Sequence, residues 1–96
     1  MFARVHFMDT QPGKRDEVTQ FIQETVLPSA RNWHGFKGYL ALLEPNTGKG
    51  IAIALWETEE DVSASAPSNQ KLVVKSMEFL TTAPVSEVYE VIVQEM

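Results

Sequence analysis

Apolar residues occupy both sides of one short segment, Gly50 to Glu57, and this pattern predicts a strand buried on both faces. Successive side chains of a strand point to opposite faces, so a strand with one face in water alternates apolar with polar residues. Both faces of this strand therefore need cover, from helices on one side and from a partner subunit, a ligand or both on the other. The two faces carry Ile51, Ile53 and Leu55 on one side and Ala52, Ala54 and Trp56 on the other.

The rest of the chain changes between a period of two, typical of strands, and apolar positions at helical spacing. Strands are predicted over 2–8, 36–43, 50–57 and 85–94, and helices over 14–31 and from 58 to 80.

Proline and capping residues locate breaks in the two helices. Pro28 is expected to kink or end the first helix, because it has no N–H to donate. Thr58 opens the second helix in a capping box, Pro67 interrupts it, and Ser68 caps its second part. The stretch from 71 to 75, taken alone, also fits a strand.

The resulting order of elements, β-α-β-β-α-β, predicts an α+β fold, a ferredoxin-like sandwich with one antiparallel sheet and both helices on one face. The helix-free face is then too apolar for a soluble monomer, so we expect two sheets to pack face to face in a homodimer. We expect residues 1–96 to form a single domain, because the chain is short.

Charge and cysteine content exclude several classes of function. The net charge is −5 and no stripe of Lys and Arg is present, so nucleic acid is not an expected partner. The chain has no cysteine, which excludes disulfides and thiolate metal sites and suits the reducing cytoplasm. Neither a leader segment nor an apolar run long enough to span a bilayer is present in the sequence, so we expect a cytoplasmic protein and no membrane partner.

Four short motifs, in this order and spacing, resemble the antibiotic biosynthesis monooxygenase family of the dimeric α/β-barrel superfamily. They are Pro12-Gly13-Lys14, Val26-Leu27-Pro28, His34-Gly35-Phe36-x-Gly38 and Leu55-Trp56-Glu57-Thr58-x-Glu60.

The resemblance implies a ferredoxin-like protomer, a homodimer whose sheets form a barrel, and a pocket between sheet and helices or inside the barrel. Enzymes of this family oxidise phenolic or quinol-type aromatics without metal or flavin, and other relatives degrade haem. Many active relatives carry a histidine in the second helix, where this chain has Ser68-Asn69-Gln70, and no histidine follows His34. We therefore expect no haem degradation and no cofactor, and quinol oxidation would depend on His6 or on a substrate that ionises readily.

Oxidation without a cofactor requires a base beside a dry cavity, because the substrate itself must supply the electrons once its phenolic proton has been removed. His6 is the candidate catalytic base, and strand alternation places Arg4 on the same face, where it could bind an oxyanion. The alternative is structural: both side chains would make hydrogen bonds, or a salt bridge with Glu90 or another acid across the dimer.

A pocket for an aromatic ligand is expected beside Trp56, because Ala52 and Ala54 precede it on the same face and leave room for a flat ring. The alternative is that Trp56 packs in the dimer core.

Tyr39 and Tyr89 could each add a hydroxyl to this pocket, or could be core rings. The sequence leaves open which face the last strand presents, so Tyr89 and Glu90 compete for the pocket. His34 follows Trp33 in a turn and is expected to be a loop residue. Two histidines far apart in the sequence, without cysteine, predict no metal site.

Three functions remain open. The leading hypothesis is a cofactor-independent monooxygenase acting on a phenol or quinol. The alternatives are a non-catalytic binding or regulatory dimer and a cofactor-free isomerase of the same fold.

Overall fold

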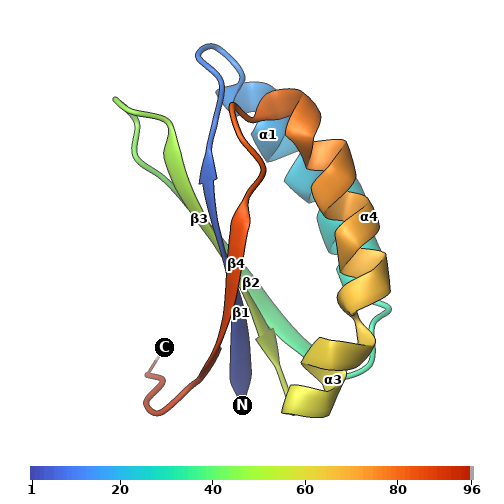
Figure 1. The fold of residues 1–96 in the computed structure, drawn as a ribbon. Coiled ribbons are helices and arrows are strands. Elements are labelled where there is room, and N and C mark those ends of the chain that lie inside the picture. Colours follow the sequence, from blue (N-terminus) through green and yellow to red (C-terminus); the bar gives the residue numbers. More distant parts are fainter. Residues whose placement is uncertain (96) are drawn as a thin grey trace.

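A computed structural model describes residues 1–95 and shows one four-stranded antiparallel sheet with all helices on one face (Figure 1). The sheet order is β2-β3-β1-β4. The predicted ferredoxin-like α+β fold is confirmed. The strands are β1 (Phe2–Asp9), β2 (Phe36–Leu43), β3 (Lys49–Trp56) and β4 (Val85–Glu90). The helical segments are α1 (Arg15–Phe21), η1 (Ile22–Val26), α2 (Leu27–Ala30), α3 (Glu59–Ala64), α4 (Ala66–Ser76) and η2 (Met77–Phe79).

The first predicted helix is present, with a change of hydrogen-bond pattern in its second half. α1 continues into a π-helical stretch, η1, and then into α2, which contains Pro28 near its start. Pro28 cannot donate to the carbonyl of Glu24, so regular α-helical bonding is interrupted there. The expected disturbance at Pro28 is confirmed, and the chain nevertheless stays helical to Ala30.

The second predicted helix begins and breaks close to the expected positions. The amide of Asp61 donates to Oγ1 of Thr58 at 3.1 Å, which confirms the predicted cap. The helix breaks at Ser65, between α3 and α4, and Pro67 lies in the first turn of α4. The prediction that Ser68 caps the second part is wrong, because Ser68 lies inside α4. Residues 71–75 are helical.

The last strand is shorter than predicted. β4 ends at Glu90, and residues 91–95 have no regular secondary structure. The amide of Val91 donates to the carbonyl of Met1 at 2.9 Å, which ties this segment to the start of β1.

Strand register decides which side chains face the helices. Arg4 lies opposite Ala54, and His6 lies opposite Ala52 on β3 and Ser86 on β4. These positions share the helix-covered face of the sheet, because directly opposed residues of antiparallel strands point the same way.

Trp56 anchors the core between sheet and helices and is completely buried. Its ring stacks on Trp33 with 5.7 Å between centroids, and the edge of Phe36 meets it at the same separation. Val62 of α3 completes this cluster. Cover of the Trp56 face by the protein's own helices agrees with the two-sided pattern of β3.

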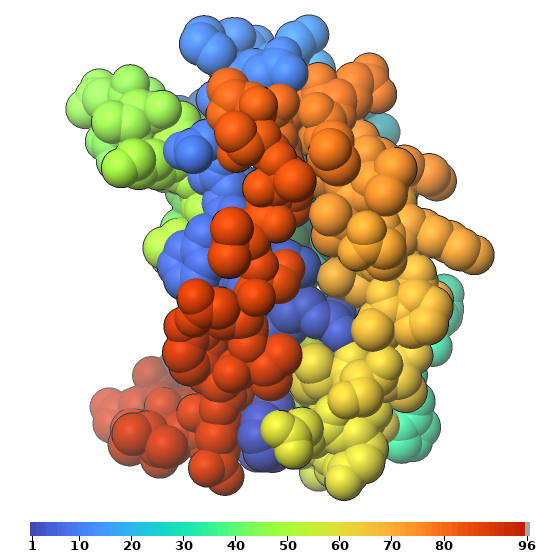
Figure 2. Space-filling view, viewed as in Figure 1, coloured from blue at the N-terminus to red at the C-terminus, as the bar shows by residue number. Residues whose placement is uncertain are grey.

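The opposite face of the sheet remains open to solvent and is apolar. Figure 2 shows the helices packed on one side only, with β4 at the front edge. Among the side chains of the open face, Leu40 is 52% exposed, Leu42 49% and Val85 61%. Within residues 1–95, no helix combines the length and apolar character needed to cross a bilayer.

Candidate active site

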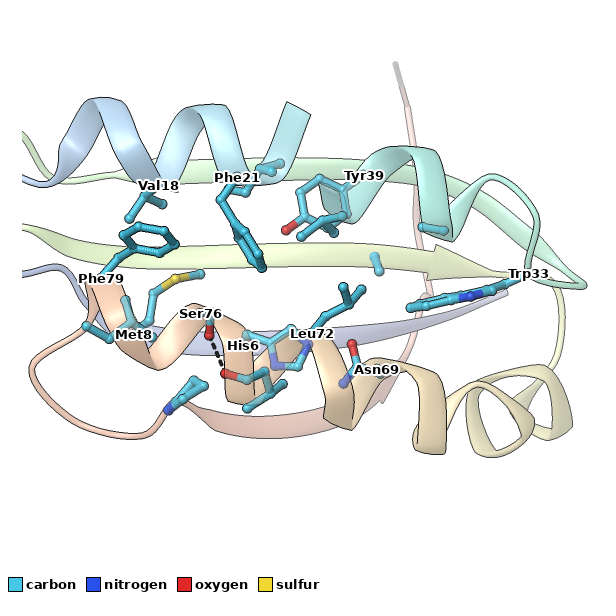
Figure 3. Close-up of a pocket in the computed structure, with 18 residues that line it drawn as sticks. His6, Met8, Val18, Phe21, Trp33, Tyr39, Asn69, Leu72, Ser76 and Phe79 are labelled. Carbon is cyan, nitrogen blue, oxygen red and sulfur yellow. Dashed lines mark hydrogen bonds between the residues drawn. The ribbon is translucent and has the colours of Figure 1, made fainter. Parts of the chain in front are cut away.

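An apolar cavity of about 70 Å³ lies between the sheet and the helices (Figure 3). Aromatic rings from the first helix, the loop before β2, β2 itself and η2 enclose it. These rings are Phe21, Trp33, Tyr39 and Phe79. Its polar side chains are few, and one of them, Ser76, donates its hydroxyl to the carbonyl of Val73 at 2.6 Å within α4. The walls of the cavity are thus aromatic and apolar and present few polar groups.

His6 is the titratable imidazole in this cavity, and β1 carries it there from the centre of the sheet. Its Nδ1 lies 2.5 Å from the hydroxyl of Ser86 on β4. The side chain of Asn69 on α4 lies near the ring (Figure 3), and a hydrogen bond with it acts on the pKa of His6. Burial lowers the pKa of His6, the charge of Arg4 lowers it further, and the bond with Asn69 opposes both. His6 is therefore neutral near pH 7, the form that can accept a proton.

Arg4 lies behind the cavity wall. Its Nη2 donates to the carbonyl of Val62 at 2.6 Å and to the hydroxyl of Ser65 at 2.7 Å. The guanidinium lies 5.4 Å from the ring centroid of Trp56. Burial lowers the pKa of Arg4. Arg4 is not a lining residue, so it acts on the cavity through its charge, which it exerts on His6.

The other predicted site residues separate into two groups. Ala52, Ala54 and Tyr39 line the cavity, and burial raises the pKa of Tyr39 to about 12, so its hydroxyl stays protonated. Trp56 is not among the lining residues, because Trp33 and Phe36 fill the space around it.

Tyr89 also lies away from the cavity. It is paired with Ala3 on the open face of the sheet, and its hydroxyl donates to the carboxylate of Glu87. Of the two residues that competed for the pocket, Glu90 has the parity of the helix-covered face, opposite Phe2, but it is exposed and does not line the cavity either.

Two polar contacts of His6 were not predicted. Ser86 is found by strand pairing alone, because β4 lies beside β1 and puts residue 86 opposite His6. Asn69 lies in the stretch Ser68-Asn69-Gln70, where the resemblance implied a histidine, so the sequence did draw attention to this part of the helix. Phe21 and Phe79 also line the cavity, and nothing in the sequence beyond their helical spacing could have predicted this.

His34 is a loop residue, as expected. Its Nδ1 lies 2.7 Å from Oδ1 of Asp61, and its side chain is 94% exposed. This hydrogen bond is the main cause that lowers the pKa of Asp61. Across residues 1–95, no three side chains of His, Asp or Glu gather closely enough to hold a metal ion.

Solved structures share this fold over nearly their whole length. A candidate antibiotic biosynthesis monooxygenase from Bordetella bronchiseptica has a TM-score of 0.79 at 14% identity, with 96% of this chain and 97% of that one covered. A second candidate of that name, from Deinococcus radiodurans, has a TM-score of 0.78 at 13% identity, covering 100% and 99%.

A third similar structure contains a ligand. It is a monooxygenase of Streptomyces coelicolor in complex with nanaomycin D, with a TM-score of 0.74 at 16% identity, and it covers 99% of this chain and 90% of that one. The sequence matches no protein-family model, and no curated protein matches it significantly. The resemblance inferred from the sequence motifs is thus supported at the level of the fold, and the chain has the fold of solved proteins named as antibiotic biosynthesis monooxygenases.

Proposed function

We propose that this chain is a cytoplasmic member of the antibiotic biosynthesis monooxygenase family that oxidises a phenolic or quinol-type aromatic with dioxygen and needs no cofactor. The observation that carries the proposal is the position of His6, a neutral imidazole in an apolar, aromatic-walled cavity. The complex of the Streptomyces coelicolor monooxygenase with nanaomycin D supports a small-molecule ligand in this fold.

The reaction begins with transfer of the phenolic proton to His6. The proton would be taken up at Nε2, which requires the neutral tautomer that carries its hydrogen on Nδ1 and donates it to the hydroxyl of Ser86. Asn69 favours the protonated ring, since its hydrogen bond raises the pKa of His6, whereas burial and Arg4 favour the neutral ring. The histidine is thereby neutral before the reaction and supported once it has become an imidazolium.

The phenolate then reduces dioxygen. One electron passes to dioxygen, the resulting radicals combine through a new carbon–oxygen bond, and loss of water from the peroxide gives a quinone. Phenol plus O₂ thus yields quinone plus H₂O, and each product receives one of the two atoms of dioxygen. The apolar walls exclude water from these intermediates, which protects them from side reactions.

A non-catalytic binding dimer is the second candidate. It is favoured by the two hydrogen bonds of His6, because a neutral imidazole has one donor and one acceptor and Ser86 and Asn69 could satisfy both. In that case the ring would hold β1, β4 and α4 together and would not abstract a proton.

Oxygen uptake with a panel of hydroquinones and naphthols distinguishes the two candidates. We expect turnover by the unmodified protein and a loss of about 10²-fold or more in His6→Gln, the range usual for a general base. His34→Gln is the matched control, because this exposed histidine lies outside the cavity. Tight binding of an aromatic without oxygen uptake from any compound would identify the protein as a binder.

We also propose that the protein is a homodimer whose open sheet faces pack together. The apolar side chains of that face support this, because a patch of such size is rarely left in water. It includes Phe7, Leu40, Leu42, Val85 and Tyr89. Light scattering on a dilute sample tests it: a folded particle of 10.8 kDa, the mass of one chain, would contradict the dimer.

A further inference from the structure

A second hollow, which we call the outer groove, adjoins the cavity. It has a volume of about 390 Å³ and lies between the first helix and β2. The same four side chains, Met8, Val18, Ile22 and Tyr39, line both spaces and form a wall between them. Figure 3 shows three of them, Met8, Val18 and Tyr39, around the cavity.

The cavity alone is too small for an aromatic substrate. Its volume is about 70 Å³, whereas a cavity of about 150 Å³ is known to hold benzene. A phenol whose oxygen reaches His6 must therefore extend past the cavity. The shared wall is the natural exit, because Met8 is unbranched and can change rotamer at low cost.

The floor of the outer groove is shaped by small residues. Ala41 of β2 is exposed in the groove and lies directly opposite Ala52, which lines the cavity. Gly50 of β3 continues the floor beside Leu43. Between Tyr39 and Leu43, the sheet surface at Ala41 thus leaves room for a flat ring.

The rim of the outer groove is polar on the helix side. Arg15, Thr19 and Gln23 recur every four residues along the first helix and all line the groove. Within residues 1–95, Arg15 has no carboxylate within ion-pair distance. A cation free of an internal partner, on the polar rim of this groove, is suited to an acidic group of a ligand.

We infer, on the basis of the proposed function, that the outer groove is a second subsite of the same active site. The substrate is an elongated aromatic: its phenolic ring lies at His6, its second ring lies over Ala41, and an acidic end group meets Arg15. Ala41 and Arg15 are then residues that determine specificity.

The test measures binding without oxygen, by isothermal titration calorimetry under argon, with phenol, 4-phenylphenol and 4′-hydroxybiphenyl-4-carboxylate. We expect the unmodified protein to bind 4-phenylphenol at least about tenfold more tightly than phenol, because the second ring is buried. Ala41→Leu should reduce this preference about tenfold. Ala64→Leu, the same change at an exposed position outside both spaces, should keep it.

Arg15→Gln should reduce the preference for the carboxylate over 4-phenylphenol several-fold and leave the preference for 4-phenylphenol over phenol unchanged. The inference is overturned if the biphenyls bind no better than phenol or do not bind, or if Ala41→Leu leaves the preference intact while its melting temperature shows a folded protein.

Oxygen uptake separates the failure of this inference from the failure of the proposed function. Biphenyl binding that responds to Ala41→Leu, without oxygen uptake, would refute the monooxygenase and keep the subsite. The opposite result has two parts: Ala41→Leu oxidises single-ring phenols as fast as the unmodified protein, and it binds the biphenyls as tightly. This result would refute the subsite and keep the monooxygenase.

Discussion

Substitution of Arg4 tests how a buried charge contributes to stability and to the pKa of His6. The guanidinium of Arg4 is buried and has no carboxylate partner within residues 1–95. Its two hydrogen bonds are worth about 1.5–3 kcal/mol each for a charged donor. The contact with Trp56 adds up to about 2 kcal/mol in a desolvated site. Burial of the charge opposes this gain by several kcal/mol. We therefore expect Arg4→Met to change the free energy of unfolding by less than about 2 kcal/mol.

Arg4→Ala should be much worse than Arg4→Met. Both remove the charge and the hydrogen bonds, but only alanine leaves the volume of the side chain empty, and the difference between methionine and alanine at a buried site is about 2–5 kcal/mol. Urea unfolding of the two variants measures this difference. Equal losses in both would show that the polar contacts, and not packing, account for the contribution of Arg4.

The same substitution should change the titration of His6. The charge of Arg4 is one cause of its lowered pKa, after burial, so Arg4→Met should raise the pKa of His6 toward 6.5. The pKa of His6 is lower in the folded protein than in the unfolded chain, so the unfolded chain takes up a proton at a higher pH. The free energy of unfolding therefore falls as the pH drops below 6.5 and through the folded pKa of His6. This loss should be smaller in Arg4→Met.

Proton NMR of the imidazole ring of His6 reads this titration directly. A His6 pKa that stays the same or falls in folded Arg4→Met would refute the electrostatic role assigned to Arg4.

Three further predictions concern stability. Trp56→Phe should lower the free energy of unfolding by less than about 1 kcal/mol, against about 3–5 kcal/mol for Trp56→Ala, because the buried indole Nε1 has no hydrogen-bond partner within residues 1–95. Similar losses for the two variants in urea unfolding would contradict this. The pKa of Asp61 is lowered, chiefly by its hydrogen bond with His34, so the stability that Asp61 contributes is complete above pH 3.8 and is lost as the pH falls through the lower folded pKa. His34→Gln should reduce this loss of stability at acid pH, measured by urea unfolding. A loss as large as in the unmodified protein would contradict the role of the His34–Asp61 hydrogen bond. Gly35→Ala should lower the melting temperature more than Gly13→Ala. Both glycines have a positive φ (80° and 79°), which strains any other residue, but only at position 35 would a Cβ collide with the Asp61 carboxylate. Equal decreases in the two variants would exclude the collision as the cause.

Strand alternation predicted which residues share a face, because a period of two follows from backbone geometry alone. It placed Arg4 and His6 together, and it placed Ala52 beside Ala54 on the side of the cavity, as the structure shows. It could not predict how far along the face the cavity extends. Trp56 has the correct parity but lies outside the cavity, because Trp33, from a loop without any periodic pattern, packs on it.

Other features depend on pairing between distant segments, which a single sequence does not determine. Tyr89 faces away from the helices because β4 pairs with β1 in the register Ala3 with Tyr89. The Arg4 contacts require the break between α3 and α4, which brings the carbonyl of Val62 and the hydroxyl of Ser65 over the sheet. Proline patterns predicted that break, but not which side chain would occupy it.

Asn69 on α4 acts on the ring of His6, the candidate base. The stretch 68–70, where the resemblance implied a histidine, has none, and the only imidazole within the cavity lining of residues 1–95 is His6 on β1. An amide cannot accept a phenolic proton near pH 7, but its oxygen can stabilise the imidazolium that forms when His6 does. In the proposed reaction, the strand would supply the base and the helix would stabilise its charged form. Asn69→Ala should therefore lower the pKa of His6 further, because burial and the charge of Arg4 would act on the ring unopposed.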